Sequence, residues 1–316
     1  MSITGRVLGR VLALQLLSLL VVTLISGCSG SDLTSRSEKV SGDAARGDVP
    51  ESTVGASLID GDLTRASDVS PQVVFVGRPE DGGGSGYDAD TVLGVRYGLH
   101  HHYERAVIDL GTGKRPAGTV PEWTLTSPEG EGLLRVNLPS AVATCVSGGE
   151  FDKGLLESFH VVRAPDGGMF VDFLTRQPFR YRVLQLQDPA RLVLDFEPSE
   201  ESLKAPPPAQ GGDTVLVEPR PNVEVSDPLT VSGYSRNPEA ANTITLTGPD
   251  GEILARRNVR SNDWSHTWGY FDATIDLPPF SGKGTLKVGT GNARDGTFEG
   301  VEVPVRAGHR PAARSG

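Results

Sequence analysis

Short apolar runs rich in β-branched residues constrain this chain most, because turn residues separate them and almost no stretch has helical periodicity. The runs in the first part of the chain are 73–76, 92–97, 105–110, 123–125, 133–138, 158–163, 169–174, 181–186 and 191–196. The runs in the second part are 214–217, 229–234, 243–246, 253–259, 271–277, 285–288 and 301–305. This spacing predicts an all-β protein built of two β-sandwich domains. Residues 151–157 are the one exception, where we expect a short helical turn although Gly154 disfavours helix.

The N-terminus has the pattern of a processing signal. Arg6 and Arg10 precede the apolar stretch 11–25, which is too short for a comfortable membrane span and suits a secretory signal. The stretch ends in Ile25-Ser26-Gly27-Cys28, which resembles the lipobox of bacterial lipoproteins. That resemblance implies removal of residues 1–27 and lipidation of the Cys28 thiol. We therefore expect a protein that a lipid anchors to the cell membrane, facing outside the cytoplasm.

Composition divides the rest of the chain. Residues 28–70 are rich in Ser, Gly, Asp and Thr and are predicted to be a flexible tether. Residues 198–212 hold a Pro-Pro-Pro run and a Gly-Gly pair, which predict an interdomain linker. The predicted domains are therefore 71–197 and 213–307, and residues 308–316 are predicted to be a tail.

The charge of the chain excludes one class of partner. It carries 40 acidic and 30 basic residues, a formal net charge of −10, whereas nucleic acids reward clustered Lys and Arg. There are only two cysteines. If Cys28 is lipidated no internal disulfide is available, and Cys145 is then a buried small residue or, as the alternative, a reactive thiol.

Residues 105–110 and 191–196 of the first domain share the pattern Arg, three apolar residues, Asp, apolar, which indicates two equivalent strands. Together with Val95-Arg96, His100 and the preceding Asp188-Pro189-Ala190, they resemble the AMIN-like domains of bacterial envelope proteins. The resemblance covers about residues 72–197 and implies a β-sandwich that binds cell-wall material in several envelope proteins. The candidate ligand-binding residues that follow are Arg96, His100, Arg105 and Arg191. The alternative use of the arginines is pairing with Asp109 or Asp195.

Residues 215–306 are similar to the immunoglobulin-like domain associated with bacterial spore germination. The matching segments are 217–221, 225–233, 251–255 and 270–273. In that family the domain often lies C-terminal in lipoproteins, which agrees with the lipobox. Within this domain Trp264 and Trp268 lie in the segment 262–270, where they either form an exposed ligand platform or fill the core.

The remaining motifs give little support to catalysis. His100 and His102 could hold zinc together with Glu104, but a histidine run in a loop is more commonly solvated. The segment 84–86 lacks the strand and helix of a nucleophile elbow, and the glycine run 82–86 lacks the Lys and Ser/Thr of a phosphate loop. We expect no cofactor and no resident metal. The predicted function is a non-enzymatic envelope module that binds peptidoglycan; the alternatives are a scaffold for another envelope protein and a metal-dependent hydrolase.

Overall fold

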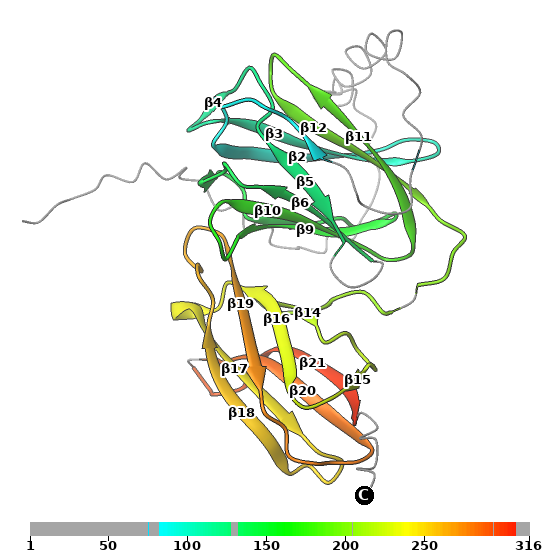
Figure 1. Ribbon diagram of the computed structural model, residues 1–316, viewed down its shortest axis with the longest axis vertical. Helices are drawn as coiled ribbons and strands as arrows, with labels where there is room; N and C mark the ends of the chain where they lie inside the picture. The colour runs from blue at the N-terminus through cyan, green and yellow to red at the C-terminus, as the bar shows by residue number, and fades with distance from the viewer. Residues whose placement is uncertain (1–74, 76–81, 128–131, 204, 293, 308–316) are drawn as a thin grey trace, which may run out of the picture.

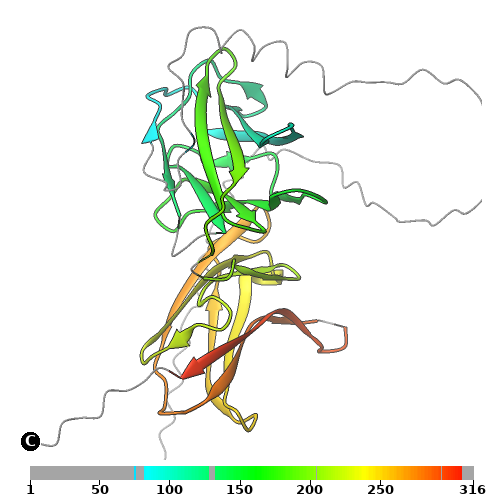
Figure 2. The same cartoon turned by 90° about the vertical axis from the view of Figure 1, so that its right-hand side faces the viewer.

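A computed structural model describes residues 75, 82–127, 132–203, 205–292 and 294–307. The predicted signal peptide, Cys28, the tether and the tail lie outside these residues. Within them the chain is nearly all β, with a single short 3₁₀ turn, η1 (Pro238–Ala240), and no α-helix. The prediction of an all-β protein is confirmed, and Figures 1 and 2 show its strands layered in an upper and a lower domain.

The first domain is a sandwich of two mainly antiparallel sheets (Figure 1). The upper sheet consists of β2 (Thr91–Leu99), β3 (Glu104–Thr112), β4 (Arg115–Pro116), β7 (Ala143–Thr144), β11 (Phe179–Leu186) and β12 (Arg191–Pro198). The lower sheet contains β1 (Gly82–Gly83), β5 (Trp123–Thr126), β6 (Leu133–Leu138), β8 (Gly148–Glu150), β9 (Leu156–Arg163) and β10 (Met169–Thr175). The main strand order of the upper sheet is β11-β12-β3-β2-β7.

Alternation of side chains along β3 shows how the sequence specifies this core. Ala106, Ile108 and Leu110 are buried in the core cluster between the two sheets. Arg105 and Asp109 occupy the alternate positions and therefore lie on the outer face of the upper sheet. Full burial of an Ile or Leu side chain contributes about 1.5–3 kcal/mol, so a one-residue slip of β3 would be costly.

The second domain is also a sandwich. One of its sheets contains β13 (Ala209–Gly211), β14 (Thr214–Glu218), β16 (Leu229–Ser235) and β19 (Trp268–Ile275). The other contains β15 (Glu224–Val225), β17 (Ala241–Thr247), β18 (Ile253–Arg260), β20 (Lys283–Gly291) and β21 (Phe298–Ala307). Its core takes buried side chains from both sheets, among them Val231, Phe271, Ile244, Leu286 and Val303.

The two domains are joined by strand pairing as well as by the chain. At the boundary β9 pairs in parallel with β19, Val162 opposite Trp268 and Arg163 opposite Gly269, so one ten-stranded sheet runs through both domains. In Figure 1 β19 begins at this boundary and runs down through the lower domain. A third core cluster lies there and takes residues from both domains: Leu133, Val162, Phe170, Leu174, Val215, Val217, Tyr234 and Trp268. We call this boundary the seam.

Polar contacts cross the seam as well. The Nε2 atom of His160 lies 3.0 Å from Oε1 of Gln210, and Arg163 Nε donates to Asp263 Oδ2 at 2.9 Å. Gln210 belongs to β13, which pairs with β14. The glycine end of the predicted linker 198–212 therefore contains a strand, β13, whose Gln210 contacts the first domain.

The expected helical turn at residues 151–157 is wrong. Residues 152–155 form bends, and Leu156 begins β9. Gly154 has a φ of +97°, which a right-handed helix does not allow. The carboxylate of Glu104 accepts the backbone N–H groups of Leu155 and Leu156 instead of leaving them to a helical turn.

Candidate functional site

The two segments with the shared Arg-to-Asp pattern are neighbouring strands. β3 and β12 pair antiparallel, so Arg105 lies opposite Asp195 and Arg191 lies opposite Asp109. Because cross-strand partners share one face of a sheet, all four side chains belong to the outer face of the upper sheet. The prediction that the pattern marks two equivalent strands is confirmed, and it explains why each Arg faces an Asp of the other strand.

Strand register gathers further arginines on the same face. Arg182 lies opposite Asp195 and Arg180 opposite Glu197, both on β11. Arg96 reaches Asp109 from β2. We call this surface the arginine face, defined by Arg96, Arg105, Arg180, Arg182 and Arg191. On the same face these strands carry three carboxylates, those of Asp109, Asp195 and Glu197, so the surface is positive within an acidic protein. The fourth carboxylate of these strands, that of Glu104, lies on the opposite face of β3 and accepts the N–H groups of Leu155 and Leu156.

The arginines differ in what they can offer a ligand. Arg105 makes a two-pronged bond to Asp195, at 2.6 and 2.9 Å, and its guanidinium is buried, so its role is structural. Arg96 makes the same kind of bond to Asp109, at 2.7 and 2.8 Å, but its side chain is 42% exposed. The hydrogen bond that Arg96 donates to Asp109 raises the pKa of Arg96 above its ordinary value. Arg191 is half-buried, and its Nε donates to the carbonyl of Pro189 at 3.3 Å.

His100 lies near the arginine face but not in a metal site. The His100 ring stacks on the Tyr103 ring with the two centroids 4.5 Å apart. The guanidiniums of Arg105 and Arg182 lie 5.1 and 5.3 Å from the centroid of the Tyr103 ring. His101 and His102 contact each other instead. Among the residues that the structure describes, no three His, Cys, Asp or Glu side chains are grouped so as to hold a metal ion. The zinc hypothesis for His100 and His102 therefore gains no support.

The two tryptophans of the second domain do not join this surface. Trp268 begins β19 and is only 9% exposed in the seam, with its ring 4.5 Å from His160 and 5.8 Å from Tyr234. Trp264 precedes it in a loop and is 42% exposed. Trp268 thus fills a core, as one of the two interpretations expected, but that core lies between domains rather than within one.

Cys145 differs from both interpretations of the sequence analysis. It is half-buried beside β7 rather than in the core, and it is disulfide-bonded. The other cysteine of the sequence is Cys28, which lies outside the described residues.

The sequence analysis did not predict that Arg180 and Arg182 belong to the arginine face, nor that the seam exists. The sequences of β11 and β10 nevertheless contain a signal for each. In β11 the two arginines alternate with Tyr181 and Val183, which is the pattern of outward and inward positions on one strand. In β10 both alternating sets are apolar or buried, as Met169, Val171 and Phe173 face one way and Phe170 and Leu174 the other. Such a run indicates a strand covered on both faces.

Comparison with known families places the second domain. A family model described as an immunoglobulin-like domain of bacterial spore germination matches residues 214–297. Residues 214–297 are an immunoglobulin-like domain of the spore germination type. No curated protein and no solved structure matches the chain significantly. For the first domain the β-sandwich fold is confirmed, whereas the AMIN-like resemblance stays a prediction.

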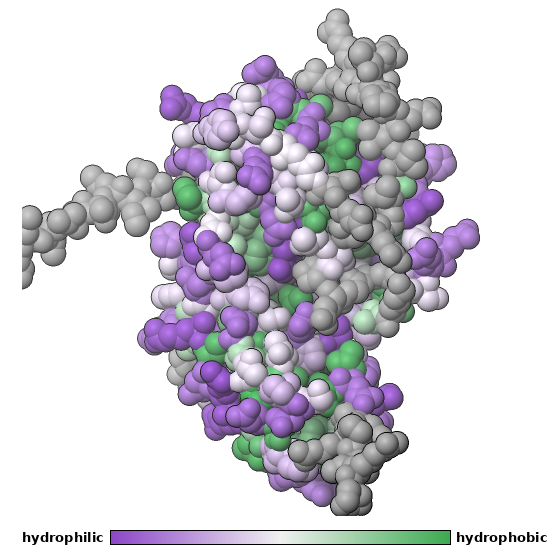
Figure 3. Space-filling model, in the orientation of Figure 1, coloured by the Kyte–Doolittle hydropathy of each residue, from purple (hydrophilic) through white to green (hydrophobic). Residues whose placement is uncertain are grey.

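The surface and the helix content add two observations. In Figure 3 hydrophobic residues on the visible face of the lower domain are scattered among hydrophilic ones. None of the residues that the structure describes forms a helix long and apolar enough to cross a membrane.

Proposed function

We propose that this protein is a non-enzymatic, extracytoplasmic module of the cell envelope whose first domain binds an anionic cell-wall polymer. The immunoglobulin-like domain of the spore germination type supports an envelope setting. The arginine face carries the proposal, because besides the buried Arg105 it holds four arginines that are exposed or half-buried, in a chain with a net charge of −10. Guanidinium groups bind carboxylate and phosphate in paired hydrogen bonds, and both groups occur in wall polymers.

The experiment is sedimentation of the full-length protein with protein-free sacculi across a salt series. We expect saturable binding that weakens as salt screens the charges. The double substitution Arg96→Ala/Arg191→Ala should weaken binding roughly tenfold, as expected for lost charge-assisted hydrogen bonds. The control Arg256→Ala/Arg260→Ala removes the same charge from exposed positions on β18 of the second domain and should leave binding unchanged.

Two outcomes would contradict the proposal. If the protein does not sediment with sacculi at low salt, the first domain is not a wall-binding module. If the control weakens binding as much as the Arg96→Ala/Arg191→Ala variant, the attraction is general to surface charge and the arginine face is not the site.

A lipid anchor on Cys28 is the second part of the proposal, supported by the lipobox in the sequence. A sulfur that carries a diacylglycerol thioether cannot also form a disulfide. The chemical state of the Cys28 sulfur therefore tests the lipid anchor directly. Mass analysis of the N-terminal peptide from membranes should find Cys28 at the mature N-terminus with acyl chains. A Cys28→Ala variant should appear in the soluble fraction. A Cys28 peptide without lipid would refute the anchor.

A protein partner is the rival function, and one observation favours it. β18 is the edge strand of its sheet, and Ile253 at its start is 60% exposed. Exposed edge strands accept strands of other proteins. Introducing proline by Asn258→Pro would block such pairing, and loss of a cross-linked envelope protein with unchanged sacculus binding would support the scaffold.

A further inference from the structure

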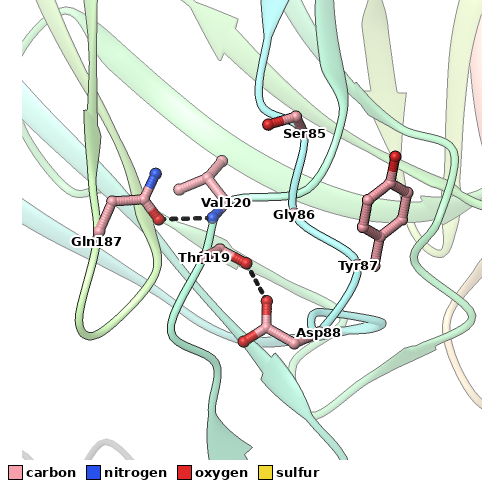
Figure 4. Close-up of a pocket in the computed structure, with 7 residues that line it drawn as sticks. All are labelled: Ser85, Gly86, Tyr87, Asp88, Thr119, Val120 and Gln187. Atoms are coloured by element: carbon pink, nitrogen blue, oxygen red, sulfur yellow. Dashed lines mark hydrogen bonds between the residues drawn. The ribbon is translucent and has the colours of Figure 1, made fainter.

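We propose that an open depression in the first domain binds a neutral pyranose ring of a glycan. The depression has a volume of about 510 Å³ and is lined by residues 85–88, Thr119, Val120 and Gln187 (Figure 4). The inference rests on the proposed function and deepens it, because it names the sugar ring as a second feature of a wall polymer that this domain contacts.

The glycine run at residues 82–86 holds one wall of the depression in place. Gly84 has a φ of +72°, and a Cβ there would lie 1.8 Å from the carbonyl oxygen of Pro121. Only glycine allows this close approach. The N–H groups of Ser85 and Gly86 both donate to the carbonyl of Val120, at 3.2 and 2.9 Å. The run therefore fixes the two residues that follow it, Tyr87 and Asp88.

Tyr87 supplies an aromatic surface. Its side chain is 100% exposed, and it is the most exposed large hydrophobic residue of the described chain. Figure 4 shows its ring standing out from the backbone of the 85–88 segment. An aromatic ring exposed in this way offers its face to apolar C–H groups, and a pyranose ring presents such groups on its faces.

The polar groups that line the depression offer both acceptors and donors. The Asp88 carboxylate accepts the Gly118 N–H at 2.8 Å and the Thr119 hydroxyl, and these bonds lower its pKa, that with Thr119 most. Gln187 Oε1 accepts the Val120 N–H at 2.9 Å, which orients the amide. The Gln187 NH₂ group has no hydrogen-bond partner within the described chain and remains a donor.

This set of groups selects a neutral ligand with hydroxyls. A hydroxyl both donates and accepts, so it suits a depression lined by a carboxylate and by an amide NH₂ group. The ionised Asp88 repels phosphate and carboxylate, which the arginine face attracts instead. The depression and the arginine face are thus suited to different parts of one polymer, the neutral sugar and the anionic group.

The test is calorimetric titration of the full-length protein with chitotetraose, a neutral oligosaccharide, and with poly(glycerol phosphate), an anionic polymer without pyranose rings. We expect chitotetraose to bind and Tyr87→Ala to weaken that binding at least about tenfold. Tyr87→Phe keeps the ring and should bind within about threefold of the original protein. The control Phe298→Ala removes an exposed aromatic ring from the second domain and should change nothing, and circular dichroism should show all variants folded.

The outcomes separate this inference from the proposed function. If chitotetraose does not bind at millimolar concentration, or binds Tyr87→Ala equally well, the depression is not a sugar site. If sacculi still bind the protein in that case, the proposed function stands without this inference. If poly(glycerol phosphate) binding depends on Tyr87, the depression takes an anion and the inference is overturned.

Discussion

At the scale of single residues, the arginines of the first domain differ in how far each guanidinium is removed from water. Arg105 and Asp195 are both buried, whereas Arg96 and Asp109 form a similar bond at the surface. An unpaired charge costs little where water can reach it and several kcal/mol where water cannot. Similar geometry therefore has a different effect on stability at the two positions.

Substitution of these arginines tests that difference. Arg105→Ala should lower the free energy of unfolding by about 3 kcal/mol, because Asp195 loses one of its two arginine partners while staying buried. Arg96→Ala should lower it by less than about 1 kcal/mol. Urea unfolding of the two variants measures both values. Equal losses would show that burial of the Arg105 pair has no energetic consequence.

His160 makes stability depend on pH. Complete burial lowers its pKa from 6.5 to about 4. Below pH 6.5 the unfolded chain binds a proton at His160 that the folded chain does not, so stability falls as the pH falls from 6.5 towards 4. The slope from this residue is roughly 1 kcal/mol per pH unit. The His160→Gln variant should lack this part of the slope in urea unfolding between pH 7 and 4.5, and parallel curves would contradict the assignment.

At the scale of elements, the approach of β9 to β3 depends on a turn that only glycine fits. A Cβ on Gly154 would lie 2.1 Å from Glu104 Oε1, and that carboxylate is held by two backbone N–H groups. Gly167 has nearly the same φ, +96° against +97°, but a Cβ there meets nothing within 4 Å. The two glycines thus separate backbone strain from side-chain collision.

Alanine at the two glycines measures this separation. Gly167→Ala should cost about 1 kcal/mol, from the positive φ alone. Gly154→Ala should cost about 1–3 kcal/mol more, because the Glu104 carboxylate must leave the N–H groups it satisfies. Thermal unfolding compares the variants, and similar melting temperatures would mean that Glu104 moves aside without loss.

At the scale of the whole molecule, we expect the seam to make the two sandwiches unfold as one body. Trp268 and Tyr234 of the second domain pack with His160 and Phe170 of the first, and β9 pairs directly with β19. Contacts of this kind couple the stabilities of neighbouring domains, which a loose linker would leave independent.

Removal of the Trp268 side chain from the seam tests whether the two domains unfold together. Trp268→Ala should cost about 3–5 kcal/mol and divide a single calorimetric transition into two, because each domain then unfolds on its own. Trp264→Ala, four residues earlier and half-exposed, should keep the single transition. A single unchanged transition in Trp268→Ala would show that the strand pairing alone holds the domains together.

The sequence by itself determined the properties that depend on neighbouring residues. Alternation along each run predicts which residues of β3 and β12 face the core, and the shared Arg-to-Asp spacing predicts their equivalence. The burial of β10 on both faces can also be predicted locally, because its residues are apolar on both faces of the strand. These predictions hold because the two-residue period of a strand is a local property of the backbone.

Only the tertiary structure decided which distant segments meet. The depression joins residues 85–88, 119–120 and 187, and the seam joins His160 to Gln210 and Trp268. The arginine face takes its members from four strands that lie together only through their register. Such contacts form when the packing of distant strands outweighs the entropy lost in closing the long loops between them. No short stretch of sequence contains both of these contributions.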